Sequence, residues 1–348
     1  TKAAGVYLYD TAGKSYIDLI SGIAVSNVGH CNPAVVKAIK DQVDAYTHLM
    51  VYGEYIQSPQ VQLAHALVES TGTTHLYQVY FTNSGTEAVE GAMKLAKRYT
   101  GRTEFISCFN AYHGASQGAL SIAGDENFKN AFRPLLPDIR HIHHGCIANL
   151  SKITSKTAAV IIEIVAGEAG VKTATPAYFQ ALRRRCDATG SLLIVDEIQS
   201  GFGRTGTFWA FEQFDIVPDI LVCAKGMGGG MPIGAFIANK EVMGVFKSNP
   251  LLGHITTFGG HPVSAAASLA TLRVLQEEHL MEQIGEKAKL FKSLLVHPQI
   301  KAIRNQGLMM ALEFESFDVL KPIIDRAIQL GVITDWFLFC DDSMRIAP

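Results

Sequence analysis

Two residues of opposite charge, Asp196 and Lys225, each stand at the end of a short apolar run. The runs at 192–195 and 220–224 contain mainly aliphatic residues, which is typical of strands buried in a parallel sheet. Open α/β sheets bind their ligands at the carboxyl ends of strands. The sequence therefore predicts that an amine and a carboxylate meet at one edge of a sheet.

An amine and a carboxylate in that position suggest pyridoxal phosphate chemistry. A lysine amine forms a Schiff base with a carbonyl, and this cofactor also needs an acid partner at its ring nitrogen. Lys225 and Asp196 would fill these two roles. The alternative is a surface lysine unrelated to the aspartate. Glycines at 226 and 228–230 favour the first interpretation, because a solvated lysine does not need them.

A second pattern indicates an anion site. A strand is predicted at 78–83, and Ser84 with Glu87 three residues later makes the capping box of a helix start. Gly85 and Thr86 would then offer free backbone N–H groups at the positive end of the helix dipole, where a phosphate binds well. A capped helix without a ligand is the simpler alternative.

An aromatic residue follows the next predicted strand, at 104–107. Tyr112 and His113 lie in a loop that reaches Gly114. Tyr112 could stack on a planar ring, and packing into the core is an equally good interpretation of this residue alone.

Three histidines, His141, His143 and His144, form a cluster in the sequence. Successive strand positions point to opposite faces of a sheet, so these side chains cannot all ligate one ion. We expect them to be solvated, and we predict no metal site.

The composition is that of an ordinary globular protein, with 348 residues, 48% hydrophobic and 18% charged, and a formal net charge of -2. A net charge this close to zero does not indicate a basic surface for nucleic acid or an anionic membrane. No apolar run is long enough to span a bilayer. Six scattered cysteines without a CxxC pair favour a cytoplasmic enzyme with reduced thiols. Both ends look cut, so a targeting segment would lie outside this sequence.

Strands alternate with helices between 78 and 238, which predicts a parallel α/β sheet. After residue 280 the pattern changes to two amphipathic helices around a strand at 310–314. We predict three parts: an N-terminal segment (1–45) that packs with the small domain, a large domain (46–265), and a small C-terminal domain (266–348).

Local signals fix several element starts. Asn32-Pro33 and Thr175-Pro176 each combine a capping side chain with a proline at the first helical position. A further helix is expected after Pro59. Residues 5–18 predict two short strands joined by a turn.

Several motifs in a fixed order carry a resemblance to a known family. The chain resembles the class III aminotransferases, which are pyridoxal-phosphate enzymes of fold type I, over nearly its whole length. The resemblance implies a large domain with a mostly parallel central sheet and a smaller α/β domain formed by both chain ends. The motifs lie at 83–87, 112–114, 167–170, 195–206, 224–226 and 257–260.

The resemblance implies a role for each cofactor residue. Lys225 would carry the cofactor as a Schiff base, and Asp196 would pair with the ring nitrogen. Gln199 is expected near the phenolic oxygen, and Tyr112 on the ring face. The other cofactor contacts that the resemblance implies are Ser84, Gly85, Thr86, His113 and, from the neighbouring subunit, Thr257.

The same resemblance implies the substrate contacts. Arg345 looks like the arginine that binds a substrate carboxylate, Glu168 looks like its partner, and Thr256 is expected to touch substrate. Thr257 would reach the cofactor of the other subunit, which implies a homodimer with shared active sites. The implied reaction moves an amino group from an amine donor to an oxo acid.

The donor is expected to be acetylornithine-like, with 2-oxoglutarate as the acceptor. Residues 22–25 and 167–170 look most like acetylornithine and related ω-aminotransferases. Ala115 departs from that pattern, because those enzymes place an arginine there to bind the donor carboxylate. Ile23 stands where ornithine enzymes have a tyrosine.

Three alternatives stay open. One is another ω-amine or 4-aminobutyrate aminotransferase, and a second is an aminomutase or decarboxylating transaminase on the same fold. The third is a Rossmann protein without pyridoxal phosphate, which the missing GxGxxG motif disfavours.

Overall fold

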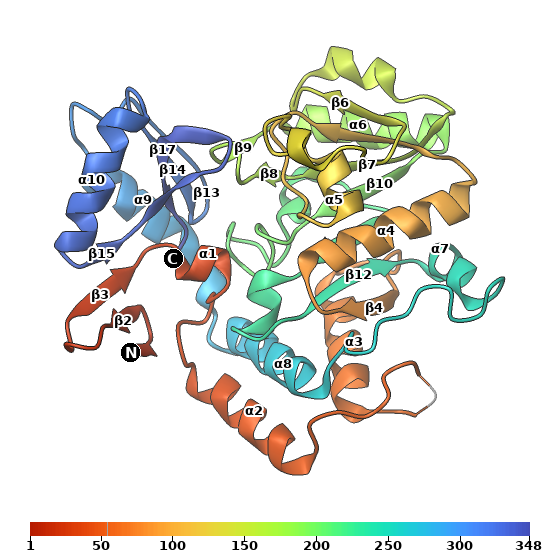
Figure 1. Cartoon of the computed structure of the whole chain (residues 1–348), viewed down its shortest axis with the longest axis horizontal. Helices are drawn as coiled ribbons and strands as arrows, with labels where there is room; N and C mark the ends of the chain where they lie inside the picture. Colours follow the sequence, from red (N-terminus) through yellow and green to blue (C-terminus); the bar gives the residue numbers. More distant parts are fainter. Residues whose placement is uncertain (54) are drawn as a thin grey trace.

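The computed structural model describes residues 1–53 and 55–348. Figure 1 shows the first strands, in red, beside the C-terminal helices and strands, in blue, at one end of the molecule. Both chain ends therefore build the smaller domain, as predicted. The boundaries after residues 45 and 265 stay predictions, and α8 (Pro262–Glu277) runs across the second one.

A seven-stranded sheet forms the centre of the large domain. Neighbouring strands are parallel except at β12, which is antiparallel to both of its neighbours. In spatial order the strands are β4 (Gln78–Thr82), β12 (Gly234–Ala238), β11 (Ile220–Cys223), β10 (Leu192–Asp196), β7 (Thr157–Glu163), β5 (Glu104–Cys108) and β6 (Ile139–Ile142).

The prediction of a parallel sheet is thus wrong at β12. The segment between β11 and β12 contains only one short turn of 3-10 helix, η4 (Lys225–Gly228). A parallel crossover needs a dozen or more residues, so the chain can only turn back beside β11.

The central sheet is buried on both faces. Val160 and Ile162 of β7 pack into one apolar core, and Ala159 and Ile161 pack into another on the opposite face. Helices cover both cores, because a parallel sheet has no solvent-facing side. On the first face lie α3 (Ser58–Ser70), α6 (Pro176–Thr189) and α8, and on the second α4 (Gly85–Thr100), α5 (Gln117–Ile122) and α7 (Lys240–Gly244).

The small domain contains two four-stranded sheets and two helices. The N-terminal and C-terminal parts of the chain are joined in this domain because strand β3 pairs in parallel with strand β15. The elements are β1 (Lys2–Ala4), β2 (Tyr7–Tyr9), β3 (Ser15–Asp18) with β15 (Val332–Ile333), and β13 (Ala302–Gln306), β14 (Met309–Glu313), β17 (Cys340–Ile346), β16 (Asp335–Phe337), with α9 (Ile284–Leu294) and α10 (Phe317–Gln329). The remaining α-helices and strands are α1 (Ser21–Ala24), α2 (Pro33–Ala45), β8 (Val165–Ala166) and β9 (Lys172–Thr173).

Most predicted element starts are confirmed. Asn32 caps α2 by accepting the N–H of Ala34 at 3.0 Å, and Thr175 caps α6. The short strands within 5–18 are β2 and β3, and β1 precedes them unpredicted. The strand expected at 310–314 is β14, between the two predicted helices.

The solvated interpretation of the histidine cluster is wrong for two of its members. His141 and His144 are half-buried and lie against backbone carbonyls, including Glu163 O at 3.0 Å from His144 Nε2. His143 is exposed. Within the described ranges no three His, Cys, Asp or Glu side chains group in a way that could hold a metal ion. None of the helices in the same part of the chain is both long and apolar enough to cross a membrane.

Candidate active site

A cavity of roughly 530 Å³ lies where β7, β10 and β11 end. Parallel strands present their carboxyl ends at one edge, so residues far apart in sequence meet there. The cavity is lined by many of the predicted site residues: Ser84, Gly85, Thr86, Tyr112, His113, Glu168, Asp196, Gln199 and Lys225. Arg345, Thr256 and Thr257 lie outside this lining.

Lys225 follows β11 directly and begins η4. Its backbone has a φ of 47°, in the left-handed region that residues with a side chain rarely adopt. Such backbone strain is concentrated at functional sites. Burial lowers the pKa of the Lys225 ammonium, and the charge of Glu168 opposes that effect without cancelling it. The amine therefore loses its proton more readily than a surface lysine.

Asp196 ends β10 and forms a buried pair with His113. The two side chains are joined by a contact of 2.8 Å between His113 Nδ1 and Asp196 Oδ2, and both are at least 95% buried. Burial alone would lower the pKa of His113, but the hydrogen bond and charge of Asp196 raise it overall. Asp196 Oδ1 also accepts the N–H of Ile198 at 3.0 Å. The carboxylate is thus fixed in place at the cavity wall.

The N-terminus of α4 forms another wall of the cavity. Ser84 caps the helix by accepting the N–H of Glu87 at 3.3 Å. The predicted capping box is only half formed, because Glu87 Oε2 accepts the backbone N–H of Asn83, not of Ser84. Gly85 and Thr86 occupy the first helical positions, where backbone N–H groups have no partner within the helix. These groups can receive an anion.

Glu168 and Arg345 form a bidentate ion pair between the two domains. Arg345 Nη1 and Nη2 donate to Glu168 Oε1 and Oε2 at 2.9 and 2.8 Å. Leu338 N donates to Oε2 at 3.0 Å, and Gln199 Nε2 donates to Oε1 at 3.3 Å. Burial alone would raise the pKa of Glu168, but the charge of Arg345 lowers it overall. Glu168 therefore occupies both Nη groups of the Arg345 guanidinium.

Gln199 approaches the backbone next to Glu168 because position 167 is a glycine. A Cβ at Gly167 would lie 2.0 Å from Gln199 Oε1, which no real contact allows. The glycine in this predicted motif thus makes room for a side chain of the same cavity.

The two threonines of the predicted set lie on the loop before α8. Thr256 Oγ1 accepts the side-chain N–H of Asn83 at 2.8 Å, so it supports the start of α4. Thr257 is exposed at the surface of this chain. Its predicted contact with a neighbouring subunit stays a prediction. Ala115, which departs from the expected arginine, is exposed and lines the cavity.

Comparisons with known proteins identify the family of this chain. A profile of the family described as aminotransferase class-III matches residues 1–348. The chain belongs to the class-III aminotransferase family. It is 44% identical to acetylornithine aminotransferase of Methanopyrus kandleri over 312 residues, which covers 89% of this chain and 79% of that relative.

Solved structures of other aminotransferases share the whole fold. The ornithine aminotransferase of Toxoplasma gondii ME49 matches with a TM-score of 0.92 at 28% identity, covering 100% of this chain and 85% of that one. Taurine:2-oxoglutarate aminotransferase from Bifidobacterium kashiwanohense, in complex with PLP and glutamate, matches with a TM-score of 0.90 at 28% identity. That match covers 100% of this chain and 87% of the other.

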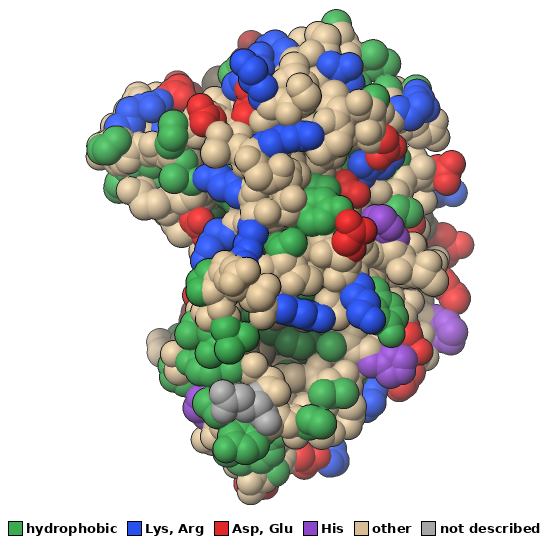
Figure 2. Space-filling model, turned by 90° about the vertical axis from the view of Figure 1, so that its right-hand side faces the viewer, with side chains coloured by type: hydrophobic (Ala, Val, Ile, Leu, Met, Phe, Trp, Pro, Cys, Tyr) green, Lys and Arg blue, Asp and Glu red, His purple; other side chains and the backbone are tan. Residues whose placement is uncertain are grey.

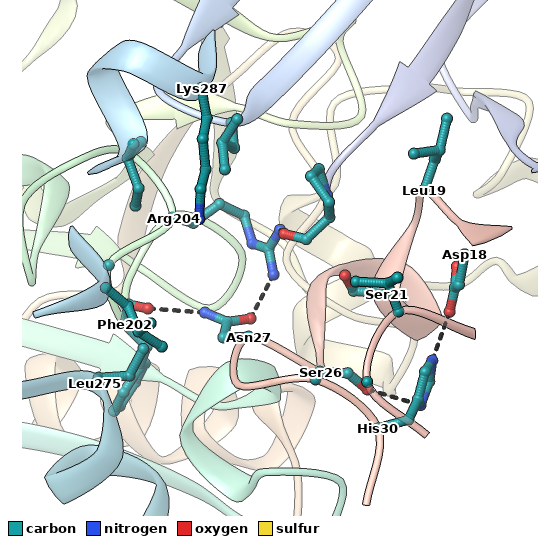
Figure 3. A pocket seen from close by; sticks show the side chains of 18 of the residues that line it. Asp18, Leu19, Ser21, Ser26, Asn27, His30, Phe202, Arg204, Leu275 and Lys287 are labelled. Carbon is teal, nitrogen blue, oxygen red and sulfur yellow. Dashed lines mark hydrogen bonds and ion pairs between the residues drawn. The ribbon is translucent and has the colours of Figure 1, made fainter. Parts of the chain in front are cut away.

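Arg204, in the motif at 195–206 of this class-III aminotransferase, lines a second cavity. Arg204 is buried, and its guanidinium donates to Asn27 Oδ1 (Figure 3). It also donates to Pro348 O at 2.6 Å. Asn27 in turn donates to Phe202 O at 2.8 Å. Burial lowers the pKa of Arg204 to about 10. This part of the motif at 195–206 joins a large-domain loop to Asn27 and to Pro348, and Arg204 is not among the described residues that line the cavity around Lys225.

Sequence reasoning missed one carboxylate of this cavity. Glu163 is the last residue of β7, lies beside Asp196 in the sheet register, and lines the same cavity. Its oxygens accept the N–H groups of Gly167 at 3.2 Å and Tyr112 at 3.4 Å. Burial raises the pKa of Glu163 to about 7, against the opposing charge of His113. A carboxylate at the end of a predicted strand was the signal available.

Proposed function

We propose that this class-III aminotransferase binds pyridoxal 5'-phosphate and moves an amino group from a terminal-amine donor to 2-oxoglutarate. Acetylornithine-like donors are favoured because the relatives at 37–44% identity are named acetylornithine aminotransferases. One observation carries the proposal: a lysine of lowered pKa and a buried aspartate line one cavity at the ends of neighbouring parallel strands.

The residues present fit each part of the cofactor. The free N–H groups of Gly85 and Thr86 suit a phosphate, the Asp196 carboxylate suits a protonated ring nitrogen, and the Lys225 amine suits the aldehyde. Tyr112 offers a ring face, and Gln199 would bind the phenolic oxygen. When bound, pyridoxal phosphate supplies an electron sink for the negative charge that develops at the substrate carbon.

The chain's own residues would then handle the protons. Lys225, whose lowered pKa favours the neutral amine, would take a proton from the substrate carbon and deliver it to the former aldehyde carbon of the cofactor. Asp196 would keep a proton on the ring nitrogen, since its buried negative charge favours the cationic form of a neighbouring base. The hydrogen bond from His113 keeps this carboxylate in position.

Arg345 and Glu168 would select between the two substrates. The carboxylate of an oxo acid needs a cation, and a guanidinium can bind both carboxylate oxygens at once. Glu168 would leave Arg345 when such an acceptor enters, and would cover it when an amine donor without that carboxylate binds. Thr256 is the further proposed substrate contact.

A second donor class is favoured by the cavity lining. Ala115 offers no charge, and the described residues that line the cavity include no arginine. A donor that carries a carboxylate at its far end would lack a cation from this chain there. Other ω-amine donors with an uncharged end are therefore the alternative function.

The proposal includes a homodimer with shared active sites, in which Thr257 serves the partner's cofactor. An exposed apolar surface, which we call the apolar face, supports it. Ile56 is 92% exposed, Leu251 76% and Phe258 53%. The rings of His48 and Phe258 lie 5.0 Å apart at an angle of 56°, so the segment that holds His48 packs against the loop that holds Phe258. Figure 2 shows hydrophobic side chains gathered on one face of the molecule. Large exposed apolar patches mark interaction sites.

A donor screen tests the proposed function. Acetylornithine, ornithine, 4-aminobutyrate, putrescine and a simple monoamine are compared by kcat/KM with 2-oxoglutarate as acceptor. We expect transamination, with acetylornithine the best donor, and none in Lys225→Ala. A neutral-ended amine as the best donor would support the alternative. Turnover without any oxo acid would contradict both and indicate an aminomutase.

A further inference from the structure

The side chain of Glu163 joins two separate backbone segments of the cavity around Lys225. Its Oε2 accepts the N–H of Tyr112, in the loop after β5, at 3.4 Å. Its Oε1 accepts the N–H of Gly167, in the turn after β8, at 3.2 Å. One carboxylate therefore fixes the position of two segments that lie far apart in the sequence.

Each of these segments carries a residue of the proposed site. Tyr112 lines the cavity itself. Gly167 precedes Glu168, whose two oxygens accept the Nη groups of Arg345. The turn is closed because Gly167 O accepts the N–H of Gly170 at 3.0 Å, so a force on Gly167 is passed on to Glu168. The spacing between Tyr112 and Glu168 thus depends on the carboxylate that binds both segments.

Glu163 is itself held firmly enough to act as an anchor. It is the last residue of β7, where the sheet register places it beside Asp196 of β10. Its backbone oxygen accepts a hydrogen bond from His144 Nε2 at 3.0 Å, and its side chain is buried. The sheet and a neighbouring loop therefore fix Glu163 from the backbone side, and its carboxylate fixes the two cavity segments.

The ionised form of Glu163 is the one that suits both bonds. A carboxylate accepts at each oxygen, whereas a protonated carboxyl carries a hydrogen on one of them. Burial raises the pKa of Glu163 to about 7, and the charge of His113 opposes that rise. Other titratable groups act on it from every strand nearby: Cys108 at the end of β5, Asp196 of β10 and Lys225 after β11.

We propose that Glu163 is a positioning residue, which sets the spacing between Tyr112 and Glu168 by accepting one backbone N–H from each of their segments. This inference rests on the proposed function, because it takes Tyr112 as the contact to the cofactor ring and Glu168 as the residue that uncovers Arg345. When one of the two N–H groups is released, its segment gains freedom, and the cavity loses its fixed geometry.

Glu163→Gln keeps the shape of the side chain but turns an amide nitrogen, which is a donor, toward one of the two N–H groups. In the holoenzyme at pH 8.5, kcat/KM for the amine donor should fall about 10-fold, as expected for the loss of one hydrogen bond to a charged group. At pH 6 it should fall by less than about twofold, because there the wild-type carboxyl is protonated as well.

Glu197→Gln is the matched control. Glu197 is a second buried carboxyl whose pKa burial raises to about 7, and it accepts the N–H of Phe211 at 2.8 Å. It is not among the described residues that line the cavity. The ratio of its kcat/KM to that of wild type should stay the same at the two pH values.

Hydrogen–deuterium exchange tests the contacts without relying on the reaction. At pH 8.5 the N–H groups of Tyr112 and Gly167 should exchange faster in Glu163→Gln than in wild type, by up to about 10-fold, because one of them has lost a charged acceptor. Glu197→Gln should leave both rates unchanged. If Glu163→Gln folds poorly, wild type replaces it: corrected for intrinsic exchange, both groups should be less protected at pH 6 than at pH 8.5.

The two measurements together decide the role of Glu163. Unchanged protection of both N–H groups overturns the proposal. Faster exchange with unchanged kcat/KM at pH 8.5 assigns Glu163 a purely structural role and overturns it as well, as does an equal loss of activity at both pH values. If wild type transaminates no donor while the exchange changes as expected, the proposed function fails and the anchoring of the two segments stands.

Discussion

The carboxylates around Lys225 each have another partner. Glu168 pairs with Arg345, Asp196 pairs with His113, and Glu163 accepts two backbone N–H groups. Within the described ranges no carboxylate oxygen lies within 4.0 Å of the Lys225 amine in an ion pair, so nothing there locks the ammonium form. At the scale of single residues, the site keeps its lysine surrounded by negative charge and yet free to lose its proton.

Glu197, next to Asp196, has a structural role that pH can expose. Its side chain is fully buried and accepts Ser200 Oγ–H at 2.5 Å and Phe211 N–H at 2.8 Å. Burial raises the pKa of Glu197 to about 7, above the ordinary value of 4.5. The folded protein therefore binds a proton that the unfolded chain loses, and this group's contribution to stability falls as the pH rises from 4.5 to 7.

Glu197→Gln should remove that part of the pH dependence. Relative to wild type, the free energy of unfolding of the variant should rise by on the order of 3 kcal/mol between pH 4.5 and pH 8, because one pKa unit corresponds to about 1.4 kcal/mol. Urea unfolding at both pH values measures the difference. Glu278→Gln, at an exposed carboxylate, is the control and should follow wild type. Parallel curves for the two variants would disprove the assignment.

At the scale of elements, local signals located the helices and strands, but not every direction or contact. The strand ends at Asp196 and Lys225 could be predicted because parallel strands share an edge. The antiparallel direction of β12 was missed, although the short connection between Lys225 and β12 indicated it. Contacts such as Arg204 with Asn27 depend on how distant segments pack, and no local pattern encodes them.

The short helix α1 shows most clearly which structure the local sequence could not predict. Its four residues, Ser21 to Ala24, have φ values of 47°, 61°, 65° and 60°, a left-handed turn with only one glycine. Left-handed backbone is costly for residues with a Cβ, so local propensity argues against it. Only the surrounding structure can hold such a turn, and the sequence alone predicted nothing of it.

The start of α4 combines stability with ligand binding, and Ser84→Ala should affect both. Loss of the N-cap should cost about 1 kcal/mol of stability. It should also weaken pyridoxal phosphate binding, because the N–H groups of Gly85 and Thr86 lose their fixed direction. Asn239→Ala is the matched control, since Asn239 caps α7 by accepting Val242 N–H at 2.7 Å and does not line the cavity.

Chemical unfolding and a spectroscopic titration with the cofactor separate the two effects of Ser84→Ala. Both cap variants should lose similar stability, and only Ser84→Ala should lose cofactor affinity. Equal affinities in the two variants would mean that the start of α4 does not hold the phosphate.

At the scale of the whole molecule, the ion pair of Glu168 and Arg345 joins the two domains beside the cavity. Glu168 comes from the large domain, and the small domain supplies Arg345 and the backbone N–H groups of Leu338 and Phe339 that donate to Glu168. Replacement of Glu168 by a substrate carboxylate would exchange bonds across this boundary. We therefore expect the choice of substrate and the relative position of the domains to be coupled.

The apolar face provides the last prediction, because a shared active site requires two chains. Ile56 is 92% exposed, and a charge there should prevent another apolar surface from covering it. Ile56→Asp should convert a dimer into a monomer in light scattering and should lose most transaminase activity, since Thr257 could no longer reach a partner's cofactor. Leu294→Asp is the control: Leu294 is 73% exposed on α9 of the small domain and should leave the dimer intact. A fully active monomer of Ile56→Asp would show that each chain completes its own site. A dimer that survives the substitution would place the interface on another face.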